Sequence, residues 1–379
     1  MKKILFINQS SELYGSDRTF LLLLHHLDRN SFFPVVILPN EGPLKLELEK
    51  LNIQVVIAPV LKLYRDMFRF KNMLQFCKDF FSAFSILNKL HKKHRFDIVY
   101  SNTFAVLIGA LFSKRNKIKH LWHVHEIIEH PRIIAWFFPK MAYYFSNIII
   151  CNSEATKQNC VQREPRIEKK CMVIYNGVPI YDIRSNSKKT DFGFDETDII
   201  ITLVGRISRL KGHIFLLKAF KELVAVYSNL KLLFVGSPVP GQEFYLEDVI
   251  NYIKDNKLEN KVKILPFSSS LDDIWNCTDI AVMPSTEKES FGLVAAEAML
   301  AKKPVVATNH GGLKEIIQNN STGFLVEPNS VSELSEAIIT LINSSELRKQ
   351  MGEKGHDRIV ADFSERSYIE AFEQTLNEL

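Results

Sequence analysis

Short apolar runs recur along the chain and are separated by longer segments in which apolar and polar residues alternate with a helical period. The runs end at polar residues or glycines, which is typical of strands buried on both faces. They occupy residues 3–7, 35–38, 55–57, 98–100 and 148–151 in the first half, and 199–204, 231–235, 262–265, 280–283, 304–307 and 323–326 in the second. This alternation predicts an α/β fold with parallel, doubly wound sheets.

The length of 379 residues predicts two domains rather than one. A polar stretch without periodicity, 184–190, separates the two sets of apolar runs and is expected to be the linker. We therefore place a first domain at 1–183 and a second at 191–361. A last helical stretch, 362–379, contains Ser364, a residue type that favours helix N-termini.

Composition narrows the class of protein. Apolar residues make up 46% of the chain, as in an ordinary globular enzyme. The five cysteines form no Cys-x-x-Cys pair, so the sequence favours a reducing, cytoplasmic environment and predicts neither disulfides nor a zinc site. The N-terminal apolar run ends at Asn8 after four residues, which favours a first strand over a signal peptide. No uncharged apolar stretch reaches the ~18 residues of a membrane span.

Charge is distributed unevenly between the two halves. Residues 1–190 carry 29 Lys and Arg against 15 Asp and Glu, whereas residues 191–379 carry 19 against 28. The segment 61–95 interleaves cations with aromatic residues, a composition that suits an anionic membrane surface. A helix pair with an apolar core face and a solvated basic face is the alternative. Nucleic acid is not an expected partner, because no recognition motif accompanies the charge.

Residues 284–300 combine a strand end, a polar loop and an apolar helix that has one charged residue, Glu297. A second carboxylate, Glu289, lies eight positions earlier. The backbone N–H groups of 291–294 would be the unpaired donors of the first helical turn, which suit an anion. Carboxylates that can bind hydroxyl groups on both sides of a phosphate site indicate a nucleotide-sugar. The candidate binding residues here are Ser290, Phe291, Gly292, Leu293, Val294 and Glu297.

A second candidate anion site follows the apolar run 199–204, where Gly205, Arg206 and Lys211 lie in one loop. Arginine can make paired hydrogen bonds to phosphate oxygens at the end of a buried strand, and lysine adds a point charge. A solvated basic loop is the alternative interpretation.

The first half offers two weaker candidates. Gly15 and Ser16 lie at a strand-to-helix turn, which either lets backbone approach a ligand or is a plain tight turn with a helix cap. His123, His125 and Glu126 follow another expected strand. A metal site would need a third ligand from elsewhere. The favoured interpretation is therefore a strand-end His125 that faces an interdomain cleft, with a structural role as the alternative for His123.

Three motifs together resemble glycosyltransferase family 4, whose members are retaining enzymes of the GT-B fold. They are Gly-Arg-Ile at 205–207 with Lys-Gly at 211–212, the Glu-x7-Glu pair of Glu289 and Glu297, and Gly-Gly-Leu-Lys-Glu at 311–315. The N-terminal match is looser: 14–16 reads Tyr-Gly-Ser where many members have Gly-Gly, and His125 precedes a glutamate instead of an aspartate.

The resemblance implies two Rossmann-like domains that face a cleft, with the final helix crossing back to the first domain. It also implies roles in which Arg206 and Lys211 hold the donor diphosphate and Glu297 binds the ribose. Glu289 would contact the transferred sugar, with His125 beside it, and residues 291–294 would offer backbone N–H groups.

The resemblance implies a retaining glycosyltransferase of the hexosyltransferase type. We expect it to be metal-independent, because no Asp-x-Asp pair occurs to hold a metal. It would move a sugar from a nucleotide-sugar to a lipid-linked glycan acceptor in bacterial-type surface polysaccharide synthesis. No cofactor is expected. The expected location is the cytoplasm, with peripheral attachment to the inner face of the membrane. The alternatives are a nucleotide-sugar epimerase of the same fold and a non-catalytic binding subunit.

Overall fold

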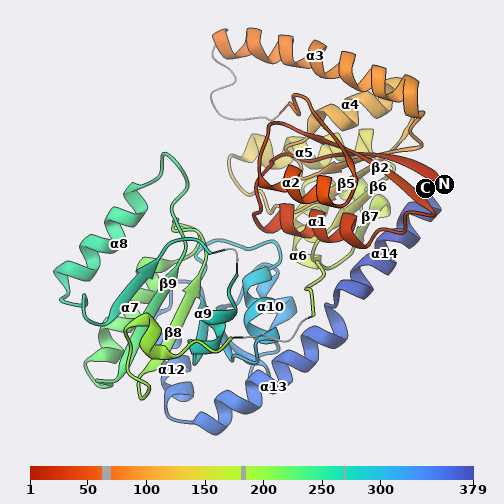
Figure 1. The fold of residues 1–379 in the computed structure, drawn as a ribbon. Coiled ribbons are helices and arrows are strands. Elements are labelled where there is room, and N and C mark those ends of the chain that lie inside the picture. The colour runs from red at the N-terminus through yellow and green to blue at the C-terminus, as the bar shows by residue number, and fades with distance from the viewer. Residues whose placement is uncertain (62–69, 181–184, 269) are drawn as a thin grey trace. The chain divides into compact units, whose positions relative to one another are not determined.

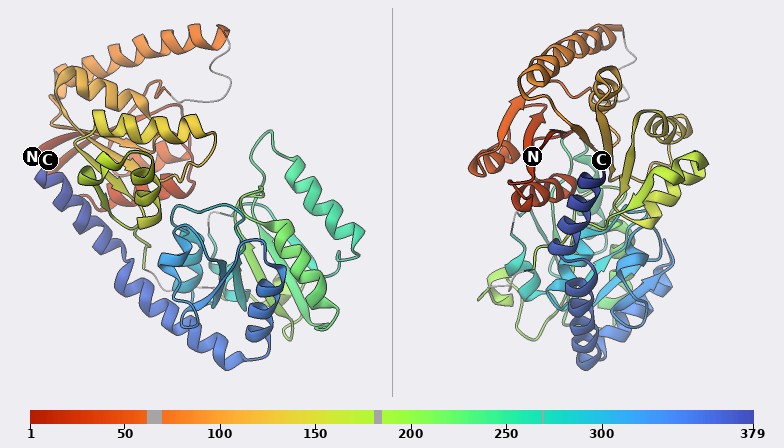
Figure 2. Two further views of the ribbon diagram at one scale, coloured as in Figure 1. Left: turned by 180° about the vertical axis from the view of Figure 1, so that it is seen from behind. Right: turned by 90° about the vertical axis from the view of Figure 1, so that its right-hand side faces the viewer.

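The computed structural model describes residues 1–61, 70–180, 185–268 and 270–379, with the side chains of 70–74 left out. The chain divides into two compact units. Unit 1 comprises Met1–Pro179 and Glu365–Leu379, and unit 2 comprises Ile180–Ser364. Each unit is a parallel sheet covered by helices on both faces, as Figures 1 and 2 show for the separate units. The predicted α/β fold is confirmed.

Unit 1 contains a seven-stranded sheet of order β3-β2-β1-β4-β5-β6-β7. Its strands are β1 (Lys2–Ile7), β2 (Phe32–Leu38), β3 (Gln54–Ile57), β4 (Ile98–Asn102), β5 (Lys119–Val124), β6 (Ile148–Cys151) and β7 (Cys171–Val173). Its helices are α1 (Gly15–His26), α2 (Pro43–Lys50), α3 (Phe70–His94), α4 (Leu107–Asn116), α5 (Arg132–Phe145), α6 (Glu154–Arg163), the 3-10 helix η2 (Pro165–Lys170) and α14 (Glu365–Glu378).

Side chains of β1 alternate between the two faces of this sheet, as a strand requires. Phe6 packs into the cluster that α1, α2 and α14 cover, whereas Ile7 packs into the cluster that α3 and α4 cover. Phe372 and Leu376 of α14 are fully buried in the first cluster. The predicted return of the last helix to the first half is therefore confirmed.

The N-terminus and the C-terminus of the described chain lie side by side in unit 1 (Figure 1). Lys2 Nζ donates hydrogen bonds of 2.9 Å and 2.8 Å to the carbonyl oxygens of Leu376 and Asn377. A cation at these last carbonyls of α14 also suits the negative end of the helix dipole.

Unit 2 contains a six-stranded parallel sheet of order β10-β9-β8-β11-β12-β13. Its strands are β8 (Ile199–Val204), β9 (Leu230–Val235), β10 (Val262–Leu265), β11 (Ile280–Met283), β12 (Val305–Thr308) and β13 (Gly323–Val326). Its helices are η3 (Lys189–Phe192), α7 (His213–Val224), α8 (Phe244–Asp255), α9 (Asp272–Cys277), α10 (Leu293–Leu300), α11 (Leu313–Ile316), α12 (Val331–Ile342) and α13 (Ser345–Asp362).

The strands of unit 2 are buried on both faces, which explains their continuous apolar runs. Leu203 and Phe234 face a core built with α7, α8 and α12. Part of the predicted linker, 184–190, lies in η3, and residue 184 lies outside the described residues. Of the helices that the structure describes, none combines the length and the apolar character needed to cross a membrane.

Candidate functional site

The strongest predicted residues of unit 2 lie in two loops that are bonded to each other. One loop follows β8 and the other follows β11, and these strands are neighbours in the sheet. Thr286 donates from its backbone N–H to the Leu210 carbonyl oxygen at 2.8 Å and from Oγ1 to the Arg209 carbonyl oxygen at 2.8 Å. Arg209 and Glu287 form an exposed ion pair across the same two loops.

Lys211 and Glu289, which are 78 positions apart, form the most protected ion pair between these loops. Lys211 Nζ lies 2.8 Å from Glu289 Oε1, with side-chain exposures of 18% and 12%. Ser285 Oγ also donates to Glu289 Oε1. Burial acts to raise the pKa of Glu289, but Lys211 and Ser285 outweigh it and the pKa lies below its usual value. Glu289 is therefore a carboxylate near neutral pH.

Two glycines allow the loops to approach this closely. Gly212 has φ of +71°, and a Cβ there would lie 1.9 Å from the Pro284 carbonyl oxygen. Gly311 has φ of +60°, and a Cβ there would lie 2.3 Å from the Glu289 carbonyl oxygen. Larger residues would force the β8 loop and the 311–312 turn away from the residues around Glu289.

The remaining predicted residues of unit 2 surround the start of α10. Gly292 caps this helix with φ of +107°, so Leu293 and Val294 lie in its first turn, where N–H groups have no partner within the helix. Phe291 is buried and packs against Phe363. Glu297 lies one turn further along α10 and is half-buried.

Arg206 lies exposed directly after Gly205 in the β8 loop. The side chain of Lys211 passes Gly205, since a Cβ on that glycine would lie 3.2 Å from Lys211 Cδ. Both predicted cations thus belong to the loop at the C-terminal end of β8, which is the edge where parallel sheets bind ligands.

Sequence reasoning did not assign a role to Ser285 or His310. Ser285 is buried beside Glu289, and His310 Nε2 is 3.0 Å from the Ser285 carbonyl oxygen. The position of each residue at the end of an apolar run, 280–283 or 304–307, is the signal that could have identified it.

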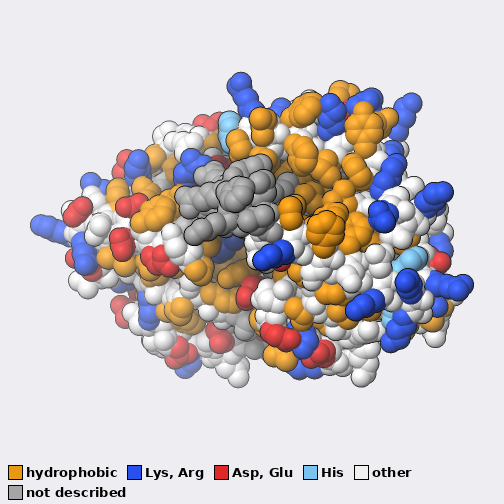
Figure 3. Space-filling view, turned by 90° about the horizontal axis from the view of Figure 1, so that it is seen from above, with side chains coloured by type: hydrophobic (Ala, Val, Ile, Leu, Met, Phe, Trp, Pro, Cys, Tyr) orange, Lys and Arg blue, Asp and Glu red, His pale blue; other side chains and the backbone are white. Residues whose placement is uncertain are grey.

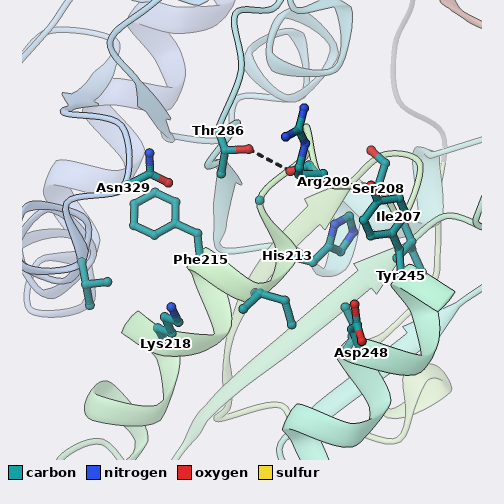
Figure 4. Close-up of a pocket in the computed structure, with 14 residues that line it drawn as sticks. Ile207, Ser208, Arg209, His213, Phe215, Lys218, Tyr245, Asp248, Thr286 and Asn329 are labelled. Atoms are coloured by element: carbon teal, nitrogen blue, oxygen red, sulfur yellow. Dashed lines mark hydrogen bonds between the residues drawn. The ribbon is translucent and has the colours of Figure 1, made fainter.

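A pocket of about 310 Å³ lies beside the β8 loop, at the N-terminus of α7 (Figure 4). Arg209, His213, Lys218, Tyr245, Asp248 and Asn329 are among the residues that line it. The predicted residues Arg206, Lys211, Glu289 and Glu297 are not among its lining residues. The pocket therefore borders the paired loops through Arg209, Gly212 and Thr286, but it does not include the residues predicted to bind the donor.

In unit 1, His125 lies one residue beyond β5, at the carboxyl edge of the sheet. Its Nε2 atom is 2.9 Å from Asn102 Oδ1 and 3.1 Å from His123 Nδ1. Burial lowers the pKa of His125 to about 3, so its ring is neutral at pH 7. His123 is fully buried and its Nδ1 lies 2.6 Å from the Tyr100 hydroxyl, which agrees with a structural role.

Glu126 follows His125, and its carboxylate bonds to the backbone of unit 1. Its Oε2 accepts hydrogen bonds from the N–H groups of Phe104 and His125, at 3.3 Å and 3.1 Å. Burial raises the pKa of Glu126 to about 7, although these hydrogen bonds oppose the shift. In the described part of the chain, no three His, Cys, Asp or Glu side chains form a group that could hold a metal ion.

The predicted turn residues Gly15 and Ser16 begin α1, on the same edge of the sheet as His125. Gly15 is exposed. The Ser16 carbonyl oxygen accepts a 3.5 Å hydrogen bond from Asn102 Nδ2, so this turn and His125 share Asn102 as a partner.

Two family models match the chain. The model described as glycosyl transferases group 1 matches residues 185–358, and the model described as glycosyltransferase family 4 matches residues 14–181.

Individual proteins match over most of the chain. An uncharacterized glycosyltransferase of Methanocaldococcus jannaschii is 30% identical over 82% of this chain and 81% of its own length. The capsular polysaccharide biosynthesis glycosyltransferase CapM of Staphylococcus aureus is 27% identical over 85% of each chain. Among solved structures, the Anabaena protein HepE in complex with UDP and glucose is 25% identical, with a TM-score of 0.86 over 100% of both chains.

Proposed function

We propose that this chain, which belongs to the group 1 glycosyltransferases, transfers a sugar from a nucleotide-sugar to a glycan acceptor with retention and without a metal ion. Its family membership is shown by a relative that is 30% identical over four-fifths of both chains and by the two family models. This membership confirms the predicted enzyme class. The observation that carries the finer proposal is the pair of bonded loops in unit 2, where Lys211 holds Glu289.

In this proposal, Arg206 and Lys211 bind the diphosphate of the donor. The departing nucleoside diphosphate gains negative charge as the sugar leaves, and fixed cations and N–H donors lower the free energy of that state. The first turn of α10 supplies N–H groups through Leu293 and Val294, and Glu297 accepts from the ribose hydroxyls. The protein's own cations thus provide the charge that a metal ion would otherwise supply.

Glu289 is proposed to bind the transferred sugar and not to attack it. Lys211 and Ser285 both bond to Glu289 Oε1, so that oxygen is engaged. The bond from the sugar's anomeric carbon to the phosphate oxygen breaks, and the bond to the acceptor oxygen forms on the same face. The departing phosphate oxygen takes the acceptor's proton, which balances the step. His125 is proposed to contact the same sugar through its ring.

Uridine diphosphate is the first nucleotide to test, because HepE was solved with UDP and with UDP-glucose. CapM is named for capsular polysaccharide biosynthesis, which supports a glycan acceptor in surface polysaccharide synthesis.

Membrane attachment is the remaining part of the proposal. The segment 61–95 lies partly outside the described residues, namely at 62–69. In the part of α3 whose side chains are described, Phe81 is 71% exposed and lies near Lys78. Hydrophobic side chains gather among Lys and Arg in the view onto α3 (Figure 3). This mixture supports an anionic lipid surface as the partner.

Helix α5 offers a second exposed apolar face that the sequence pattern did not predict. Ile133, Trp136 and Tyr144 lie on one side of it and are 75%, 49% and 52% exposed. Lys140 lies over the Trp136 ring at 4.0 Å, and α5 contains no acidic residue. Flotation with vesicles of neutral and anionic lipid tests the attachment: Trp136→Ser should reduce binding to anionic vesicles, and Val226→Ser, an exposed residue of unit 2, should not.

The central experiment compares two arginines of one loop. Arg206→Ala should reduce transfer by about 10²- to 10³-fold, the loss seen when one fixed donor to a transition-state anion is removed. Arg209→Ala, which removes an exposed cation paired with Glu287, should leave transfer nearly unchanged. Equal rates for both variants would contradict the proposed donor site.

Two further experiments test the reaction and the donor. Donor incubated without acceptor should yield no isomer, since an isomer would indicate an epimerase. A thermal-shift screen with UDP, GDP, ADP and dTDP identifies the nucleotide, because a bound ligand stabilises the folded protein.

A further inference from the structure

The surroundings of His125 contain buried amide side chains whose orientations can be deduced step by step. Asn8 and Asn102 are both fully buried, so each amide must direct its NH2 group to acceptors and its oxygen to donors. Asn8 lies at the end of β1 and Asn102 at the end of β4, the neighbouring strand.

The first step fixes Asn8. Its Nδ2 atom donates to the Ser10 carbonyl oxygen at 2.8 Å and to Asp17 Oδ1 at 2.9 Å. A carbonyl oxygen can only accept, so the NH2 group of Asn8 must lie on this side. The amide oxygen of Asn8 therefore faces the opposite way, toward Asn102.

The second step fixes Asn102. Its Nδ2 atom donates to Asn8 Oδ1 at 2.6 Å and to the Ser16 carbonyl oxygen at 3.5 Å. Because both partners are acceptors, the amide oxygen of Asn102 must face His125. Asn102 Oδ1 lies 2.9 Å from His125 Nε2, and an amide oxygen cannot donate, so this hydrogen bond requires a proton on Nε2.

The third step concerns the other ring nitrogen. Within the described part of the chain, His125 Nδ1 makes no hydrogen bond, while the backbone N–H of His125 is occupied by Glu126. A neutral ring with its proton on Nε2 carries a lone pair on Nδ1. That atom can accept a hydrogen bond and cannot donate one.

We propose that Asn8 and Asn102 are positioning residues that hold His125 as its Nε2–H tautomer, so that Nδ1 accepts a hydrogen bond from a hydroxyl group of the transferred sugar. The sugar contact rests on the proposed function, whereas the tautomer does not. The site then favours a donor sugar with a hydroxyl at this position over one with a carboxylate, because a carboxylate would place its lone pairs against that of Nδ1.

Nitrogen-15 NMR of the full chain labelled at histidine tests the tautomer without donor or acceptor. The His125 signals are assigned by their loss in His125→Gln. The expected result at pH 7 is one neutral form with a protonated Nε2 and an unprotonated Nδ1. A proton on Nδ1 in the unchanged protein would overturn the inference, whatever the enzyme's activity proves to be.

Asn102→Ala tests whether Asn102 imposes this state. It should produce a mixture of tautomers and lower the transfer rate by about 10- to 100-fold, the size of the loss known for metal-binding histidines that lose their outer hydrogen-bond partner. Ser101→Ala is the matched control, because Ser101 lies in the same strand and bonds to His120 instead. It should leave the His125 signals unchanged. A pure Nε2–H form in Asn102→Ala would contradict the positioning role.

Discussion

The two candidate clusters differ in how they hold polar groups. In unit 2, Lys211 and Glu289 form a charged pair between loops that follow neighbouring strands. In unit 1, burial keeps the His125 ring neutral, and the ring is held by the amide of Asn102, which in turn bonds to the amide of Asn8. The first arrangement suits stabilisation of a phosphate charge that changes during reaction, and the second suits fixed orientation of an uncharged group.

The clusters also differ in what supports them. The unit 2 pair depends on close loop contacts at Gly212 and Gly311. The unit 1 network depends on α14, since the Phe372 ring lies 5.0 Å from His123 and 6.2 Å from Tyr100 between ring centroids. Helix α14, at the end of the sequence, therefore supports residues that lie in the first third of the sequence.

The largest expected effect tests this support. Phe372→Ala should destabilise unit 1 by about 3–5 kcal/mol, because it leaves a cavity in a fully buried core. Denaturation can be followed at Trp122 in unit 1 and at Trp275 in unit 2, both buried, after Trp136 is replaced by Phe. Phe220→Ala, the matched change in unit 2, should shift the Trp275 transition instead. Equal shifts of both transitions in each variant would remove the contrast between the units.

The next prediction concerns charge at the unit 2 cluster. Lys211→Met should lower kcat/KM for transfer by about 10²- to 10³-fold, because a cation proposed to face the leaving group is lost. Lys221→Met, an exposed lysine of α7, serves as control and should keep the original rate. A smaller loss of kcat/KM for Lys211→Met than for Asn102→Ala would show that the unit 1 cluster contributes more to transfer than the unit 2 cluster, contrary to this prediction.

Acid should affect unit 1 more than unit 2. In unit 1, burial lowers the pKa of His120 and His125 to about 3 and that of His123 well below its usual value, and it also lowers the pKa of His91 and His94. In unit 2, burial lowers the pKa of His213 to about 3. A lowered folded pKa means that the unfolded chain binds the proton first, so stability falls as pH drops below about 6.5.

Glu126 opposes this trend within unit 1. Its folded pKa, about 7, exceeds the unfolded value, so its contribution weakens as pH rises toward 7 and is regained as pH falls toward about 4.5. On unfolding in acid, His120, His123 and His125 together take up three protons and Glu126 releases one, whereas His213 takes up one in unit 2. From these groups alone, the free energy of unfolding of unit 1 should therefore fall by about 1.4 kcal/mol more per pH unit than that of unit 2. Urea denaturation at pH 6.5 and 5.5, followed at Trp122 and Trp275, measures the difference. Equal losses of stability in the two units between these pH values would disprove the predicted difference.

The smallest expected effect compares two ion pairs of the same loops. Arg209 and Glu287 are 74% and 43% exposed, so a double-mutant cycle should give a coupling of about 0–1 kcal/mol. Lys211 and Glu289 are mostly buried, and their coupling should be larger. The cycles use denaturant midpoints of single and double alanine variants, and a stronger coupling in the exposed pair would contradict the order.

Local sequence predicted the strands of unit 2 and most strands of unit 1, but not β7 at Cys171–Val173. The run 280–283 and the run 148–151 form β11 and β6 with the predicted bounds, because continuous apolar residues require burial on both faces. Lys211 and Glu289 were recognisable because cations and carboxylates after strand ends have few structural reasons to be there. Their roles toward a donor stay predictions.

The unit 1 network could not be predicted in this way. Asn8 and Asn102 are 94 positions apart, and each looks like an ordinary strand-ending asparagine until the sheet order places β1 beside β4. The exposed face of α5 was hidden for a similar reason. Its apolar residues fit both a buried helix and a surface one, and the packing of Phe138 and Ala142 decides which side is covered.

Unit 1 is built from two chain segments, Met1–Pro179 and Glu365–Leu379, and this affects how it can fold during synthesis. The ribosome must make all of Ile180–Ser364 before α14 emerges, which takes about 10–40 s at ordinary elongation rates. During that interval the apolar surface that will receive Phe372 and Leu376 is open to solvent, while unit 2 can already fold. The nascent N-terminal half is therefore the natural client for a chaperone until the last fifteen residues arrive.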